Sequence, residues 1–159
     1  MTVTGVVTCV REYVRGEQAR PADRPTRVLV VDDEEPVIAL VERTLRDAGY
    51  ETLGATSGPD AIRLALTSAP FDLLVTDVQM PQMLGSELAR HLRLHDPTLK
   101  VLYLTGFTDT LFRERVSLWA DEAFLEKPCS ETGLLEAVAL LLRGRLPATR
   151  SCRPPSAAP

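Results

Sequence analysis

The stretch VLVVDDEE, residues Val28 to Glu35, decides the fold that the sequence predicts. Its first four residues are apolar and mostly β-branched, which is typical of a strand buried on both faces. Four carboxylates follow without a break, namely Asp32, Asp33, Glu34 and Glu35. Carboxylates this close repel one another, so the stretch is either a strand that stops at a solvated loop or a group of acids that holds a divalent cation.

Apolar strands and amphipathic helices alternate along the chain after this stretch. We expect strands over residues 27–31, 50–55, 71–77, 100–105 and 123–126. The first expected helix has an apolar face from Val37 to Ala48, and the second starts at Ser57. The third has Leu88 and Leu92 on its inward face, and the fourth and fifth span residues 108–120 and 130–143. This alternation predicts an α/β fold in which helices cover both faces of a parallel sheet.

Length and composition predict one domain with an extension at each end. At 159 residues, of which 45% are hydrophobic and 25% charged, the chain fits one soluble domain. We expect the domain at residues 26–143, a flexible extension at residues 1–25 and a disordered tail rich in Pro and Arg at residues 144–159. No apolar stretch of about 18 residues and no convincing signal peptide is present, so we expect a cytoplasmic protein without membrane contact.

Charge and cysteine content argue against a DNA-binding protein and against a disulfide-stabilised protein. The chain has a net charge of −4, and its acids are concentrated between residues 27 and 142. Such a surface repels phosphates, so we expect no direct DNA binding. Cys9, Cys129 and Cys152 are widely spaced and odd in number, which predicts free thiols and no disulfide framework.

Polar residues follow the expected strands at their carboxyl ends, where ligands bind in an open parallel sheet. They are Asp32 and Asp33 after the first strand, Asp77 after the third, Thr105 after the fourth and Lys127 after the fifth. An acid at one strand end is often only a solvated cap. Five polar groups at the same edge favour a functional pocket.

Four motifs in this order carry a family resemblance: VLVVDDEEP, LLVTDVQMPQMLG, VLYLTGF and FLEKP. The intervals between Asp33, Asp77, Thr105 and Lys127 are 44, 28 and 22 residues. The chain resembles, over about residues 26–143, the CheY-like receiver domain of two-component response regulators, and DVQMPQMLG nearly reproduces the family's D-x-x-M-P-x-M-x-G. The resemblance implies a flavodoxin-like (βα)₅ fold and a single-domain signalling switch. It would be no enzyme beyond its own phosphorylation and dephosphorylation.

The resemblance implies a role for each site residue. Asp77 would accept a phosphoryl group from a sensor histidine kinase or a histidine phosphotransfer protein. Mg²⁺ would be held by Asp33, Asp77 and the backbone carbonyl of Gln79, with Asp32 acting through a water. Lys127 and Thr105 would bind the phosphoryl group. These roles are physically reasonable, because a carboxylate can approach a phosphoryl group only where cations offset their repulsion.

Two interpretations of Phe124, three residues before Lys127, stay open. In the family, an aromatic residue there turns inward when the threonine moves toward the phosphoryl group. This would alter the face of the fourth helix, fifth strand and fifth helix for an unknown downstream partner. Alternatively, Phe124 is simply a core residue. The resemblance also implies a cis Lys127-Pro128 bond, and Ala120 stands where the family usually has Gly.

Gln79 and Phe107 border the expected path of the water that hydrolyses phospho-Asp77. The Gln79 amide could hold that water in line, whereas the Phe107 ring could exclude it. We expect the shielding by Phe107 to dominate.

Three alternatives remain at this stage. The chain could be the receiver module of a hybrid histidine kinase, or a phosphate sink. A haloacid-dehalogenase-like phosphatase also combines Asp, Thr, Lys and Mg²⁺, but it would need a D-x-D after the nucleophile strand. With 16 residues after Arg143 no DNA-binding output domain fits, so we expect any effect on transcription to pass through a partner.

Overall fold

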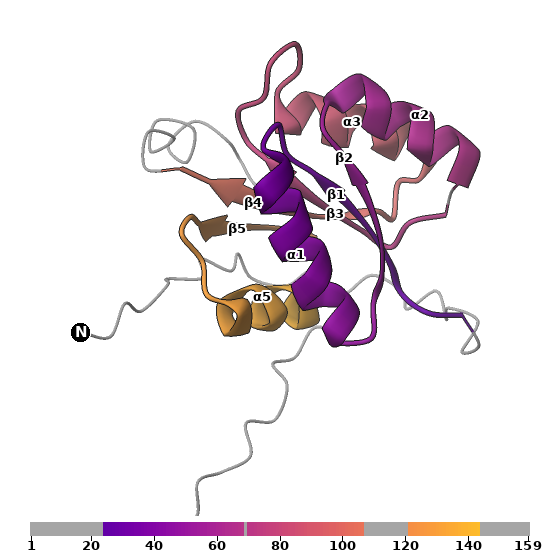
Figure 1. Ribbon diagram of the computed structural model, residues 1–159. Helices are drawn as coiled ribbons and strands as arrows, with labels where there is room; N and C mark the ends of the chain where they lie inside the picture. Colours follow the sequence, from indigo (N-terminus) through magenta and orange to yellow (C-terminus); the bar gives the residue numbers. More distant parts are fainter. Residues whose placement is uncertain (1–23, 69, 107–120, 144–159) are drawn as a thin grey trace, which may run out of the picture.

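The computed structural model describes residues 24–68, 70–106 and 121–143, which form one sheet with helices on both faces (Figure 1). The strands are β1 (Arg27–Val31), β2 (Glu51–Ala55), β3 (Leu73–Asp77), β4 (Lys100–Thr105) and β5 (Glu122–Glu126). Their order is β2-β1-β3-β4-β5, and all neighbours are parallel. The predicted doubly wound α/β fold is confirmed.

The helices lie in two layers. Helices α1 (Glu35–Asp47) and α5 (Glu131–Arg143) cover one face of the sheet, and α2 (Gly58–Ser68) and α3 (Gly85–His95) cover the other (Figure 1). Helices α2 and α5 begin one residue after the predicted starts at Ser57 and residue 130, and α5 ends at the predicted Arg143. Glu35 lies in the first turn of α1, where its charge is favourable to the helix dipole. The helix predicted over residues 108–120 lies outside the described residues.

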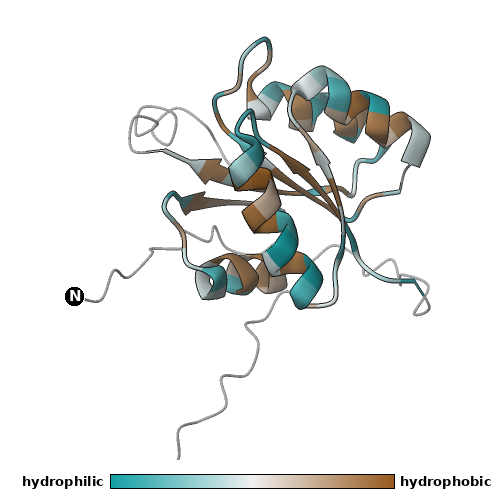
Figure 2. Ribbon diagram, in the orientation of Figure 1, coloured by the Kyte–Doolittle hydropathy of each residue, from teal (hydrophilic) through white to brown (hydrophobic). Residues whose placement is uncertain are grey.

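Each face of the sheet buries its own apolar cluster, because successive strand residues point to opposite sides. Leu74 of β3 belongs to the cluster with Leu88 of α3. Its neighbour Leu73 belongs to the other cluster, with Leu45 of α1 and Val138 of α5. Figure 2 shows the result, with hydrophobic inner strands between helices that carry both hydrophobic and hydrophilic residues. Burial on both faces explains why the inner strands are continuous apolar runs.

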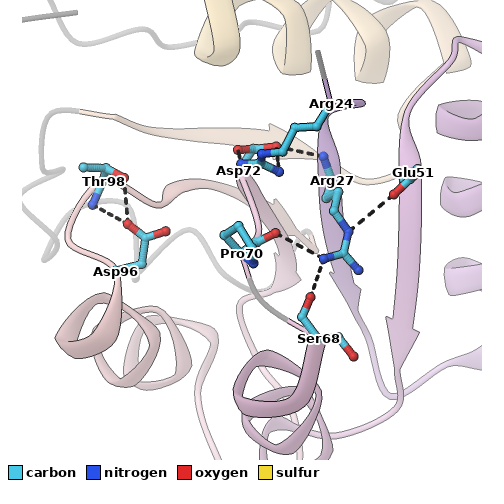
Figure 3. Close-up of polar contacts among 8 residues, drawn as sticks. All are labelled: Arg24, Arg27, Glu51, Ser68, Pro70, Asp72, Asp96 and Thr98. Atoms are coloured by element: carbon cyan, nitrogen blue, oxygen red, sulfur yellow. Dashed lines mark hydrogen bonds and ion pairs between the residues drawn. The ribbon is translucent and has the colours of Figure 1, made fainter. Parts of the chain in front are cut away.

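The start of β1 is held by a buried carboxylate at the amino edge of the sheet (Figure 3). The Arg24 guanidinium donates to both carboxylate oxygens of Asp72, over 2.8 and 3.3 Å, and the Arg27 N–H donates to the same group over 2.9 Å. The Arg27 side chain also lies 3.4 Å from a Glu51 carboxylate oxygen and 3.4 Å from the Pro70 carbonyl oxygen. These contacts fix the chain before β1 to the turn that leads into β3.

A positive φ occurs next to Ala120, the position at which the resemblance implies glycine. Ala120 itself lies outside the described residues. Asp121, which directly precedes β5, has φ 74°. Aspartate tolerates this left-handed conformation better than alanine does, because its side chain can hydrogen-bond locally.

The structure also bears on the predictions about cysteines and membrane-spanning helices. Cys129 is a free thiol, as predicted, whereas Cys9 and Cys152 lie outside the described residues. In the part of the chain that the structure describes, none of the helices combines the length and apolar character needed to cross a bilayer.

Candidate functional site

The predicted polar residues lie at one edge of the sheet. Asp32 and Asp33 follow β1, Asp77 ends β3, Thr105 ends β4, and Lys127 follows β5. Strands β3 and β4 pair Asp77 with Leu104, and β4 and β5 pair Thr105 with Glu126, so these ends are level. The parallel sheet therefore brings residues from four strands to one place.

Three carboxylates form the acidic part of the site. Asp32, Asp33 and Asp77 each offer an oxygen, and these oxygens lie within 4.8 Å of one another. Asp32 is 1% exposed, Asp77 is partly buried, and Asp33 is exposed. Three negative charges so close destabilise one another unless a cation lies among them. The donor set, all oxygen, suits a hard divalent ion.

Lys127 provides the positive charge of the site. Its Nζ lies 2.7 Å from Asp32 Oδ2 and 3.5 Å from Asp77 Oδ2. Burial favours the neutral amine, but the hydrogen bond and charge of Asp32, together with Asp77, outweigh burial and raise the pKa of Lys127. Lys127 is therefore a fixed ammonium in this site.

The pKa of Asp77 is raised above the ordinary value for aspartate. Burial is the largest cause, and the negative charge of Asp32 adds to it, while the positive charge of Lys127 opposes it. A further cation beside Asp77 would lower this pKa, because it would favour the charged carboxylate. The site is thus arranged so that Asp77 gains from a bound cation.

The loop after β3 packs against Asp77 through a glycine. A Cβ on Gly85 would lie 2.1 Å from the Asp77 carbonyl oxygen, so only glycine fits there. The Gly85 N–H donates to the Val78 carbonyl over 3.0 Å, and Gln82 turns the loop with φ 73°. Gln79 is exposed, and its N–H lies 3.4 Å from Asp77 Oδ1.

Thr105 and Lys127 are joined through the backbone. The Lys127 N–H donates to the Thr105 carbonyl over 2.7 Å, and the Thr105 side chain is buried. The Lys127-Pro128 peptide bond is cis, as predicted. Phe107, the second residue proposed to tune hydrolysis, lies outside the described residues.

Phe124 points into the core. It is 6% exposed, and its ring stacks on that of Tyr103 at a centroid distance of 5.0 Å and an interplanar angle of 27°. This inward orientation fits both interpretations of Phe124, so its role as a switch stays a prediction.

The sequence did not predict a partly buried ion pair between α3 and β5. Arg93 Nη1 of α3 lies 2.6 Å from Glu122 Oε1 of β5. The predicted strand started at Ala123, which left Glu122 outside it, and Arg93 lies on a helix rich in charged residues. The sequence offered one weak signal, a charged residue directly before the predicted strand. Charged residues at such positions are usually exposed, so this residue did not indicate a buried contact.

Comparison with known proteins identifies a class of signalling domain. The sequence matches the response regulator receiver domain over residues 28–139. The chain therefore belongs to the receiver domain family of two-component response regulators. This membership disfavours the phosphatase alternative.

Relatives carry the similar segment in different contexts. The chain is 36% identical to the transcriptional regulatory protein YrkP of Bacillus subtilis, over 74% of this chain and 49% of YrkP, so it spans about half of that protein. It is 32% identical to the response regulator receiver protein CpdR of Brucella abortus, over 73% of this chain and 96% of CpdR. It is also 32% identical to the sensor kinase CckA of the same species, over 79% of this chain and 13% of CckA.

A solved structure shares the fold. The response regulator TrrA of Thermotoga maritima, in complex with Mg²⁺ and BeF, aligns with a TM-score of 0.64 and 34% identity, covering 74% of this chain and 99% of TrrA.

Proposed function

We propose that this receiver accepts a phosphoryl group on Asp77 from a histidine kinase or a histidine phosphotransfer protein, in a cytoplasmic relay. One observation carries the proposal. The carboxylates of Asp32, Asp33 and Asp77 lie within 4.8 Å of one another, beside the Lys127 ammonium. Three carboxylates alone could bind a cation, but they would repel a phosphoryl group. An ammonium 3.5 Å from Asp77 Oδ2 adds a positive charge that can pair with a phosphoryl oxygen.

The residues fit Mg²⁺ as the cation. Mg²⁺ prefers six oxygen ligands, commonly one or two carboxylates with waters and phosphate oxygens. Asp33, Asp77 and the Gln79 carbonyl are the proposed direct ligands. Both Asp32 oxygens already accept hydrogen bonds, from Lys127 over 2.7 Å and from a backbone N–H over 2.9 Å. This supports a role for Asp32 through a water. When bound, Mg²⁺ offsets the negative charge of Asp77 and of the incoming phosphoryl group.

The proposed transfer exchanges one bond for another. An Asp77 carboxylate oxygen forms a P–O bond while the P–N bond of phosphohistidine breaks, and the imidazole leaves with that electron pair. Lys127 holds its charge beside the attacking oxygen and pairs with a phosphoryl oxygen. The Thr105 hydroxyl, at the end of the neighbouring strand, donates to another.

Acetyl phosphate tests the proposal without the kinase. We expect the chain to gain one phosphoryl group, seen as a single mass increment of the intact protein, when Mg²⁺ is present. The modified peptide should contain Asp77, and EDTA should prevent the reaction. A chain that gains no group with Mg²⁺, or gains it equally well in EDTA, would contradict the proposal.

Asp33→Ala is expected to weaken Mg²⁺ binding by at least about tenfold, since loss of an outer-shell partner alone already has effects of this order. The reason is that Asp33 is one of only three groups of the protein that we propose as direct Mg²⁺ ligands. Titration calorimetry measures the affinity. Glu35→Gln is the matched control, because Glu35 is an acid of the same run that lies in the first turn of α1. Equal Mg²⁺ affinity of Asp33→Ala and the wild type would exclude Asp33 as a direct ligand.

For the downstream partner, we propose the surface of this protein that binds it. We propose that phosphorylation alters the face that β5 and α5 present to a partner. The fourth helix, predicted over residues 108–120 as part of this face, lies outside the described residues. The similarity to CckA favours one alternative, a receiver module of a hybrid kinase. Transfer from phosphorylated chain to a purified histidine phosphotransfer protein would indicate a relay, and loss to water alone would indicate a phosphate sink.

A further inference from the structure

A charged pair with a buried carboxylate lies outside the proposed phosphorylation site. Glu122 starts β5, and its side chain is only 4% exposed. Arg93 of α3 binds it over 2.6 Å through Nη1, and donates through Nε to the Leu99 carbonyl over 3.0 Å. One guanidinium thus fixes the position of α3, of the turn before β4 and of the start of β5.

The Glu122 carboxylate also holds an aromatic ring. The Tyr103 hydroxyl donates to Glu122 Oε1, the same oxygen that Arg93 binds, over 3.4 Å. Burial and the Glu122 charge raise the pKa of Tyr103, so the hydroxyl keeps its proton and stays a donor. The Tyr103 ring is almost fully buried, and the Phe124 ring stacks on it at 5.0 Å.

The strand register links this network to the proposed switch. Tyr103 pairs with Phe124 across β4 and β5, and Thr105 is two residues further along β4 on the same side. Glu122 is likewise two residues before Phe124 on β5. Tyr103 therefore lies beside Phe124, with Glu122 of the ion pair toward the start of the strands and Thr105 toward their ends.

We infer that Arg93 is a positioning residue for the switch: through Glu122 it fixes Tyr103, and the Tyr103 ring holds Phe124 turned inward. The inference rests on the proposed function, because the inward orientation of Phe124 is the one that phosphoryl binding would favour. A buried ion pair is weak evidence for stability alone, since apolar residues of similar volume often stabilise a core equally well. What this pair adds is a fixed geometry for one hydroxyl and its ring. It also makes α3 part of the switch, in addition to β4 and β5.

Tyr103→Phe is the most direct test, since it removes only the anchoring hydroxyl and keeps the ring. We expect the NMR cross-peaks between the rings at positions 103 and 124 to weaken, because the unanchored ring no longer holds Phe124. We also expect beryllofluoride with Mg²⁺ to bind about fivefold more weakly, a typical coupling between two sites. Glu122→Gln and Arg93→Met should act in the same direction. If Arg93→Met does not fold, Tyr103→Phe decides.

Arg63→Met is the matched control, since Arg63 pairs with Asp60 on the exposed surface of α2. It should leave the ring cross-peaks and the beryllofluoride affinity unchanged. A folded Tyr103→Phe variant with both wild-type cross-peaks and wild-type affinity would overturn the inference. Failure of the wild type to bind beryllofluoride would instead overturn the proposed function, and the ring cross-peaks would still report on whether Tyr103 positions Phe124.

Discussion

Asp77→Asn is expected to reduce phosphoryl acceptance from acetyl phosphate to an undetectable level. Asparagine has the same shape as aspartate, but its amide carries no negative charge and is a poor nucleophile. The neighbouring acids cannot take over. Both oxygens of Asp32 are occupied by hydrogen bonds, and Asp33 is exposed to solvent. Intact-protein mass spectrometry after incubation with Mg²⁺ measures the result.

The fold of this variant should survive. Burial makes the charged form of Asp77 unfavourable in the native state, which is why its pKa is raised. A neutral side chain removes that cost at neutral pH, so the melting temperature should be equal to or above that of the wild type. Asp47→Asn, at the end of α1, is the control and should accept a phosphoryl group normally. A mass increment that persists in Asp77→Asn would refute the assignment of the acceptor.

Gly85→Ala is expected to lower the free energy of unfolding by about 3 kcal/mol, at the upper end for overpacking a close contact. The added Cβ would lie 2.1 Å from the Asp77 carbonyl oxygen, and a backbone atom cannot rotate away as the end of a side chain can. Either the end of β3 or the start of α3 must shift. The Asp77 carboxylate moves with its backbone, so phosphoryl acceptance should also slow.

Urea unfolding measures the loss of stability, provided that the slope of the transition is unchanged. Gly133→Ala in α5 is the matched control. A Cβ there meets only the Ser130 hydroxyl, at 3.1 Å, and alanine has the higher helix propensity. Its stability should stay within about 1 kcal/mol of the wild type. If Gly85→Ala is as stable as Gly133→Ala, the contact with Asp77 does not require glycine.

The layers of the fold and the edge that carries the site were predictable because they depend on local patterns. The run from Leu73 to Val75 is apolar because helices cover both faces of β3. Once all strands are parallel, residues that end separate strands must lie at one edge, whatever their distance in sequence. The strand pattern therefore predicts that Asp32, Asp77 and Lys127 lie close together.

The contacts within the site were less predictable, because they depend on distances between elements. The sequence did not indicate that the Lys127 ammonium would lie nearer to Asp32, at 2.7 Å, than to Asp77, at 3.5 Å. Nor did it indicate that Arg93 and Glu122, from a helix and a strand 29 residues apart in sequence, would form a partly buried pair. A charged residue at an element boundary looks the same in sequence whether it ends in water or against a partner.

The contact between Arg24 and Asp72 has a practical consequence for experiments. It holds the chain before β1 at the amino edge of the sheet, whereas Asp77 lies at the carboxyl edge. A strand of five residues separates the two edges by about 16 Å. A biotin or affinity handle attached ahead of Arg24 would therefore anchor the protein to a sensor chip by the end away from the pocket. An immobilised receiver could then meet a kinase in solution with its acidic pocket unobstructed.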